Sequence, residues 1–138
     1  MASPVAGGSG QVISLKYQGG AAPLQFSCIK LGTAAMTCDT ATAKTDKILG
    51  IVQELPMSIQ TSTNWFAPVA LSGVSYAVAS AAIAIGDTLI PTTAGKMATG
   101  TRTTWSGTFV MTIGVAMSAS ASDLDIFTVL IRPQENGY

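Results

Sequence analysis

The sequence contains no histidine, so it lacks the side chain that most often acts as a general base near neutral pH. This excludes Ser-His-Asp and Cys-His catalytic groups, Cys2His2 zinc fingers and HExxH metalloprotease motifs. A search for other catalytic constellations among the remaining residues is also negative. We therefore expect a protein that is not an enzyme and that carries no cofactor or metal.

Charged residues are scarce as well: they make up 10% of the 138 residues, against about a quarter in a typical soluble domain. Seven basic and seven acidic side chains give a formal net charge of zero, and the lysines and arginines are scattered. A phosphate-binding groove needs clustered basic residues, so nucleic acid is not an expected partner. Polarity comes instead from Thr, Ser, Gln and Asn, which are buried against another protein at modest cost. The composition favours a surface that packs against copies of the chain or a partner; a small β domain with a neutral surface is the alternative.

No hydrophobic run has the character of a membrane span. The stretch 66–85 is apolar, but Pro68, a glycine and several serines interrupt it, and alanine supplies most of its apolar content. Val74, Tyr76 and Val78 alternate with smaller residues, which is the period of a β-strand. The first ten residues lack the basic and apolar regions of a signal peptide. We expect synthesis and assembly in a cytoplasm and no membrane partner.

The two cysteines, Cys28 and Cys38, are ten positions apart around a segment that contains Gly32. If this segment is a hairpin loop, the two side chains could face each other across the strands, within reach of a disulfide. A reducing cytoplasm favours free, buried thiols instead. Two thiolates alone would leave a zinc ion half coordinated, so a metal site is not expected.

Turn residues divide the chain into an arm and a series of short apolar segments. We assign residues 1–22 to an extended, flexible N-terminal arm and residues 23–138 to a single β domain. No 3.6-residue apolar stripe persists for three turns, which excludes an all-α fold, and the period-two alternation predicts a small all-β barrel or sandwich. Residues 40–47 are a polar loop or one or two helical turns, and Pro133 should end the last strand. The predicted strands are 12–17, 24–31, 48–53, 57–61, 65–71, 74–79, 87–90, 96–98, 108–117 and 124–132.

A weak internal repeat predicts two similar half-barrel units within this domain. Segment 49–53 resembles segment 113–117, and each is followed by a Ser/Ala/Thr-rich link and an aromatic-led apolar strand. Segments 30–33 and 84–87 are a further candidate pair. The shared glycines, Gly50 and Gly114, are predicted to mark a β-bulge or a close approach of two backbones.

The remaining polar patterns are explained better by turns than by chemistry. Asp123 and Asp125 could serve glycoside hydrolysis or hold calcium, but a calcium loop needs more oxygen ligands, and a turn before the final strand is the preferred interpretation. Gly95 and Lys96 lack the first glycine of a phosphate loop. They are predicted to form a hairpin turn in which the glycine has a positive φ.

Aromatic residues suggest where a partner binds. Trp65, Trp105 and Tyr76 could form a stacking platform for sugars or bases, although Trp65 is predicted to open a core strand. Trp105 lies in a polar loop near Arg102, a composition typical of interface hot spots. The candidate partner contacts are Arg102 and Trp105, with Val5 and Gln11 of the arm.

Four segments form a longer pattern: Ile-Ala-Ile-Gly-Asp-Thr-Leu-Ile at 83–90, Ala-Gly-Lys-Met at 94–97, Ile-Gly-Val-Ala-Met-Ser-Ala-Ser at 113–120, and the apolar strand ending at Ile131. This pattern resembles the small capsid cement (head decoration) proteins of tailed bacteriophages. Thr-Asp-Lys-Ile-Leu-Gly-Ile-Val at 45–52 is similar to a first-half version of it. The resemblance covers residues 30–131; residues 99–108 look like an insertion, and the arm lies outside it.

The resemblance implies a β-barrel or β-tulip-like domain, often trimeric, that binds the outer face of an assembled icosahedral head and stabilises it. It implies the major capsid protein and other copies of the chain as partners, on the exterior of a virion assembled in a host cytoplasm. The alternative hypothesis is a receptor- or carbohydrate-binding fibre or tail module of a virion, in which Trp65, Trp105 and Tyr76 form the binding platform.

Overall fold

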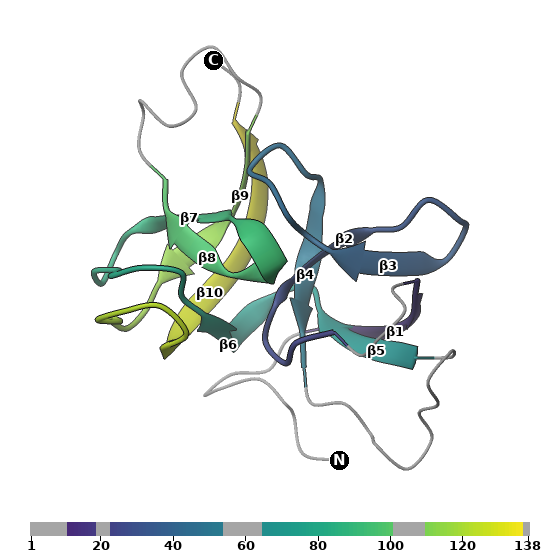
Figure 1. Cartoon of the computed structure of the whole chain (residues 1–138), viewed down its shortest axis with the longest axis horizontal. Coiled ribbons are helices and arrows are strands. Elements are labelled where there is room, and N and C mark those ends of the chain that lie inside the picture. Colours follow the sequence, from purple (N-terminus) through teal and green to yellow (C-terminus); the bar gives the residue numbers. More distant parts are fainter. Residues whose placement is uncertain (1–10, 19–22, 54–64, 101–109, 137–138) are drawn as a thin grey trace.

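The computed structural model describes residues 11–18, 23–53, 65–100 and 110–136, and these residues form an all-β fold, as the sequence predicts (Figure 1). A short 3-10 turn, η2 (Thr93–Gly95), is its one helical element within those ranges. The strands are β1 (Val12–Tyr17), β2 (Cys28–Leu31), β3 (Thr37–Thr40), β4 (Ile48–Val52), β5 (Trp65–Ala70), β6 (Gly73–Val78), β7 (Thr88–Pro91), β8 (Met97–Thr99), β9 (Val110–Ala116) and β10 (Ile126–Asn136).

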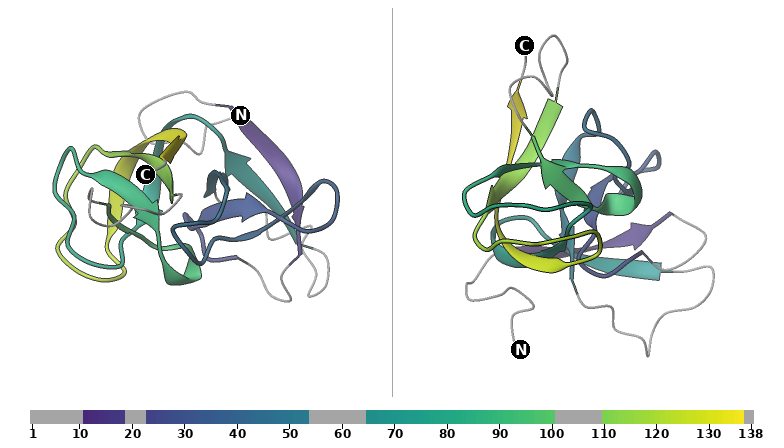
Figure 2. Two further views of the ribbon diagram at one scale, coloured as in Figure 1. Left: turned by 90° about the horizontal axis from the view of Figure 1, so that it is seen from above. Right: turned by 60° about the vertical axis from the view of Figure 1, so that its left-hand side comes forward.

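The strands form two five-stranded units that lie beside each other (Figures 1 and 2). The first unit is a closed barrel in the order β1-β3-β2-β4-β5, and the second is a sheet in the order β6-β10-β9-β7-β8. Parallel pairing of Tyr17 with Cys38 joins β1 to β3 and closes the barrel. A parallel bridge between Ala79 and Met97 occupies the same place in the second unit. Both units therefore follow one plan, with β1 to β5 corresponding to β6 to β10.

Backbone pairing repeats between the units residue by residue. Ile29 lies opposite Gly50 between β2 and β4, and Leu89 lies opposite Gly114 between β7 and β9. Backbone hydrogen bonds outside the ladders repeat as well. In the first unit, N–H groups donate to carbonyl groups in the pairs Val52–Ser27, Phe26–Val52, Gln53–Pro68 and Gln18–Cys38. The corresponding pairs in the second unit, in the same order, are Ala116–Asp87, Gly86–Ala116, Met117–Thr128 and Ser80–Met97.

Left-handed backbone positions also coincide in the two units. Phe26 (φ 64) corresponds to Gly86 (φ 90), and Met36 (φ 59) corresponds to Gly95 (φ 73). This backbone region favours glycine, so the second unit has the less strained residue at both positions. The predicted repeat is therefore confirmed, although each unit is a full five-stranded assembly. The predicted match of 30–33 with 84–87 is wrong, because the pairing register aligns Ile29 with Leu89.

The two repeated glycines allow the neighbouring backbone to approach closely, as predicted. A Cβ atom on Gly50 would lie 2.0 Å from the carbonyl oxygen of Ala70, and one on Gly114 would lie 1.8 Å from that of Leu130. Both distances are far inside van der Waals contact. Any side chain at either position would push apart the fourth and fifth strands of its unit.

The interiors of the two units are formed by corresponding positions, but at some of these positions one unit has a large side chain and the other a small one. Leu15 of β1 lies opposite Ala67 of β5, whereas their counterparts are Ala77 and Phe127, a small residue opposite a large one. The interior of the barrel consists of Leu15, Tyr17, Ile29, Cys38, Val52, Ala67 and Val69, and the counterparts in the second unit are Ala77, Ala79, Leu89, Met97, Ala116, Phe127 and Val129. All fourteen are buried, and in the Leu15–Ala67 and Ala77–Phe127 pairs the large residue stands on the opposite strand, so each pair still places one large side chain in the interior.

Two predicted boundaries need correction. Residues 12–17 were assigned to the arm 1–22, but they form β1, which pairs with β5 along its whole length and buries Leu15 and Tyr17. Apolar alternation in this segment outweighs the glycine-rich flanks. Pro133 does not end β10, because a register shift between Ile131 and Gln134 accommodates its missing N–H and pairing with β9 continues to Asn136. The predicted strand 57–61 lies outside the described residues.

The cysteines point to opposite sides of the β2–β3 hairpin. Cys38 lies opposite Leu31 and faces the barrel interior, whereas Cys28 lies beside Ala41 and belongs to the apolar cluster shared with the second unit. Both thiols are free and buried, the alternative that the sequence favours. A disulfide would require the hairpin to change register.

Burial of the two thiols should make the free energy of unfolding fall at alkaline pH. It raises the pKa of Cys38 from 9.0 to about 11, with a further contribution from the neighbouring Asp39 carboxylate, and it raises the pKa of Cys28 further still. A thiol with a raised folded-state pKa contributes its full stability below the unfolded-state pKa and loses it as the pH rises through the folded-state value. We expect the free energy of unfolding in urea to decline from about pH 9 upward, by up to about 1.4 kcal/mol per pH unit for each thiol.

The control for this prediction is the double variant Cys28→Ala, Cys38→Ala, which should show a smaller alkaline decline because both thiols are absent. A thiol reagent near neutral pH should label neither cysteine in the native protein and both in urea. Rapid labelling of the native protein would contradict the burial of these groups.

Candidate interaction surface

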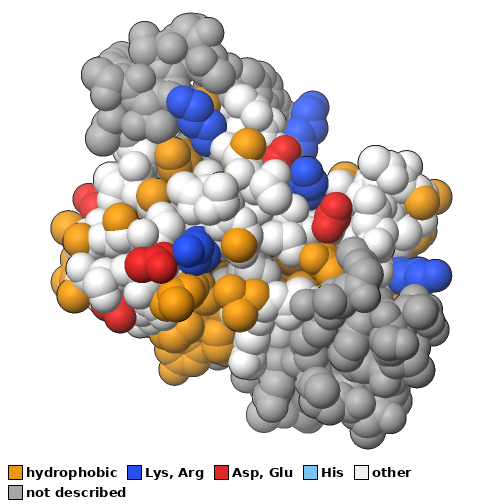
Figure 3. Space-filling view, in the orientation of Figure 1, with side chains coloured by type: hydrophobic (Ala, Val, Ile, Leu, Met, Phe, Trp, Pro, Cys, Tyr) orange, Lys and Arg blue, Asp and Glu red, His pale blue; other side chains and the backbone are white. Residues whose placement is uncertain are grey.

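Charged side chains are dispersed, and several are paired within the chain. Lys30 Nζ lies 3.4 Å from Asp46 Oδ2, and Lys96 Nζ lies 2.8 Å from Asp123 Oδ1. On the face seen in Figure 3, the basic side chains form no continuous strip. This distribution offers no track for a phosphate backbone on that face.

Two carboxylates hold loops in place. Asp125 accepts hydrogen bonds from the N–H groups of Ala121 (2.9 Å) and Ser122 (3.0 Å), which hold the pKa of its carboxyl below its usual range. Asp87 accepts from the N–H of Ala84 (2.9 Å) and the hydroxyl of Thr99 (2.7 Å), and the pKa of Asp87 is lowered for the same reason. These contacts support the interpretation of 123–125 as a turn.

The geometry gives no support to glycoside hydrolysis or calcium binding at Asp123 and Asp125. Asp123 pairs with Lys96, and Asp125 is used by its own loop. Nowhere in the part of the chain that the structure describes do three or more His, Cys, Asp or Glu residues cluster to hold a metal ion. Asp125 therefore stabilises the backbone of its loop, and Asp123 forms an ion pair with Lys96.

Segments 79–87 and 117–125, which we call the loop end, form the tip of the second unit at the left of Figure 1. Ile83 and Ser120 exchange backbone hydrogen bonds of 3.0 and 2.9 Å across the two segments. The N–H of Leu124 donates to the carbonyl of Ala79 at 2.8 Å. These bonds and the two aspartate contacts make the loop end an ordered surface rather than a pair of separate loops.

The loop end is apolar and exposed. Ile85 is 71% exposed, Leu124 is 61% exposed and Met117 is 51% exposed. Leu124 also has a left-handed backbone (φ 70), a conformation that costs a non-glycine residue free energy and is enriched at functional positions. Exposed alanines at positions 82, 84, 119 and 121 complete this surface.

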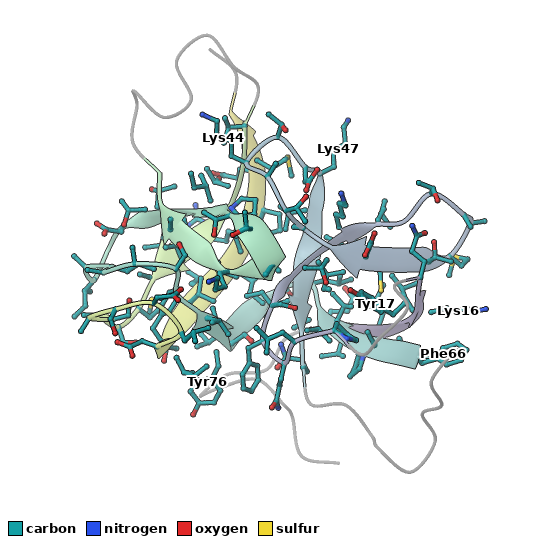
Figure 4. The ribbon with its side chains drawn as sticks, in the orientation of Figure 1. Lys16, Tyr17, Lys44, Lys47, Phe66 and Tyr76 are labelled. Carbon is teal, nitrogen blue, oxygen red and sulfur yellow. The ribbon has the colours of Figure 1, made fainter. Side chains whose placement is uncertain are left out.

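The outer side of β6, β10 and β9 is a second apolar surface. Val74 pairs with Leu130, and Leu130 pairs with Val115, so the three side chains lie on one side of the sheet, where each is partly exposed. Tyr76, on the same side, is 42% exposed and projects from β6 (Figure 4), and its ring contacts that of Phe26 edge to face. Figure 3 shows apolar side chains gathered at the lower ends of these strands.

The structure describes one of the four predicted contact residues. Gln11 is exposed before β1, where its N–H donates to Ser72 Oγ (3.3 Å) and its carbonyl accepts from the N–H of Leu71 (2.7 Å). Val5, Arg102 and Trp105 lie outside the described residues. Ile85 and Leu124 were not predicted as contacts, although Ile85 directly precedes the Gly-Asp turn signal, where an exposed branched side chain is unusual.

The segments that carry the resemblance come together in the second unit. Segments 83–90 and 113–120 meet through the Ile83–Ser120 bridge, and segment 94–97 forms the turn between β7 and β8, with the predicted positive φ at Gly95. Among the described residues no helix is long and apolar enough to cross a membrane. Comparison of the chain with protein-family models and with curated proteins finds no match.

Proposed function

We propose that the protein is a structural virion protein, a capsid cement or decoration protein that binds the outer surface of an assembled icosahedral phage head and stabilises it. The observation that carries this proposal is the loop end, a rigid and apolar surface whose carboxylates are occupied by its own backbone or by Lys96. Its partner would be the major capsid protein. The protein would act on the capsid exterior, as a homotrimer and without catalysis.

Rigidity and low charge suit binding to a large, preformed shell. A surface that is already ordered loses little conformational entropy on binding, and hydrogen bonds to the carboxylates reduce the cost of burying their charge. Exposed Ile85 and Leu124 provide apolar area of the kind that marks interaction sites. Modest affinity per copy is sufficient, because each bound copy shifts the equilibrium of the shell toward the assembled state.

Co-sedimentation with shells of the source virus, stripped of this protein, tests the proposal. Wild-type protein should bind, and the variant Ile85→Ser, Leu124→Ser should lose at least about tenfold in affinity, because each large apolar side chain buried contributes about 1.5–3 kcal/mol. Leu24→Ser is the matched control, since Leu24 is an exposed leucine of the first unit. The control should bind like wild type.

Two outcomes would overturn the proposal. One is absence of shell binding by the folded wild-type protein. The other is glycan binding on an array without affinity for shells, which would favour the receptor- or carbohydrate-binding fibre or tail module. Equal loss of binding in the double variant and the Leu24→Ser control would exclude the loop end as the contact.

A further inference from the structure

One outer face of the first unit is completely buried within the chain. This covered face consists of Ser27, Cys28, Ala41, Ile51 and Ala70, which have no exposed surface. The second unit covers it: β4 contacts β9 and β10, and the apolar members of the face belong to the same hydrophobic cluster as Ile113 of β9. The contact between the units is therefore an extended apolar interface.

The turn between β7 and β8 fits into the covered face. The N–H of Gly95, at the tip of this turn, donates to the carbonyl of Ala41 at 2.8 Å. A Cβ on Gly95 would lie 2.6 Å from Ser27 Cβ and 3.0 Å from Thr40 Cγ2, so the turn is in tight contact. Polar bonds beside it fix the arrangement: Met111 N–H donates to the Lys44 carbonyl (3.0 Å), and Gln53 Nε2 donates to Ser75 Oγ (2.8 Å).

Among the described residues of the second unit, the matching face is only partly covered: Gly100, the counterpart of Ala41, is buried, but the other positions are not. Pairing registers make Asp87, Thr88, Val115 and Leu130 the counterparts of Ser27, Cys28, Ile51 and Ala70, and all four are partly exposed. We call these four residues the open face. The Asp87 carboxylate accepts hydrogen bonds from the N–H of Ala84 and the hydroxyl of Thr99, which reduce the cost of covering its charge.

The first unit presents the matching turn, and no described residue of the second unit is seen to receive it in the way that the first unit receives the β7–β8 turn. The β2–β3 turn corresponds to the β7–β8 turn, and Met36 holds the place of Gly95 with the same left-handed φ. Met36 is 77% exposed and Leu31 is 59% exposed. In Figure 1 the β7–β8 turn points into the first unit, and the β2–β3 turn points away from the molecule at the right.

The contact within the chain is thus head to tail: a turn of one unit meets an outer face of the other, and each unit has both parts. We propose that a second copy of this chain makes the corresponding contact, with its β2–β3 turn seated on the open face of the first copy. Because Met36 has a side chain where Gly95 has none, this turn lies farther from the face than Gly95 does from Ser27. A repeated head-to-tail contact closes into a ring or continues as a filament. This proposal goes beyond binding to a shell, and its test needs no shell.

The mass of the full chain in solution, measured by sedimentation velocity over a concentration series, tests the proposal. Wild type should self-associate, whereas a turn variant (Leu31→Ser, Met36→Ser) and a face variant (Thr88→Arg) should each stay monomeric. An equimolar mixture of the two variants should form a 1:1 dimer and nothing larger, because it retains one intact turn and one intact face. The wild type distinguishes the two possible geometries, because a head-to-tail contact allows growth beyond a dimer, whereas a two-fold symmetric contact stops at two copies.

Two controls keep the result interpretable. Phe66→Ser changes an exposed side chain of the first unit outside the turn and the covered face, and it should associate like wild type. Val115→Thr is a second, milder face variant, and urea unfolding of every variant verifies its fold. A monomeric wild type, a mixture that stays monomeric, or a turn or face variant that dimerises alone would overturn the proposal.

Discussion

Replacing Gly114 with alanine is expected to lower the free energy of unfolding by at least about 3 kcal/mol, or to prevent folding altogether. The new Cβ would lie 1.8 Å from the carbonyl oxygen of Leu130. The backbone fixes the position of a Cβ, and the carbonyl oxygen belongs to the backbone of the neighbouring strand in the middle of the second sheet. No side-chain rotation can therefore relieve the overlap. Gly50→Ala should have a similar effect, because its Cβ would lie 2.0 Å from the carbonyl oxygen of Ala70.

Gly86→Ala is the matched control for this effect. Gly86 has a φ of +90, but no atom lies within 4 Å of the position its Cβ would take. Only the backbone strain of a left-handed residue remains, which costs about 1–2 kcal/mol. Urea unfolding of the variants should therefore rank Gly114→Ala well below Gly86→Ala. Equal losses would show that the strands separate easily at Gly114 and would contradict the close approach.

Phe127→Ala should cost about 3–5 kcal/mol, because it leaves a cavity in the interior of the second unit. Phe127 is buried opposite Ala77, the reverse of the first unit, where Leu15 lies opposite Ala67. Adding Ala77→Leu to Phe127→Ala installs the first-unit arrangement in the second unit. The double variant should recover a large part of the lost stability, since the leucine fills space that the ring vacates.

A double-mutant cycle measures this coupling. Ala77→Leu alone should destabilise by about 1–3 kcal/mol through overpacking, so a stabilising interaction between the two changes must appear in the double variant. Simple addition of the two losses would show that the corresponding positions do not share one interior site. Urea unfolding at neutral pH gives all four corners of the cycle.

Much of the fold could be predicted from the sequence because period-two alternation and turn residues act locally. The strands 12–17, 48–53 and 74–79 and the roles of Gly50 and Gly114 follow from such patterns. β3 was not predicted, because Thr-Cys-Asp-Thr has one apolar residue and depends on β1 and β2 for its place. Its parallel pairing with β1 joins segments distant in the chain, and no local signal encodes it.

The candidate surfaces were harder to predict, because exposure depends on which segments meet. Val115 and Ile51 occupy corresponding places in similar sequences, but Ile51 is buried by the other unit and Val115 is partly exposed. Likewise, the apolar Ile85 and Leu124 give no local sign that both lie outside the core. Only the arrangement of the two units separates core positions from contact positions.

Leu71 and Ser72, the two residues between β5 and β6, tether the units. A link this short holds the β7–β8 turn at a high effective concentration beside the face it fills, so the two units remain docked without dependence on protein concentration. The same contact made between separate chains has no such tether. Its occupancy must therefore follow the local density of copies, and any lattice that gathers the chains would strengthen it without adding a single new contact.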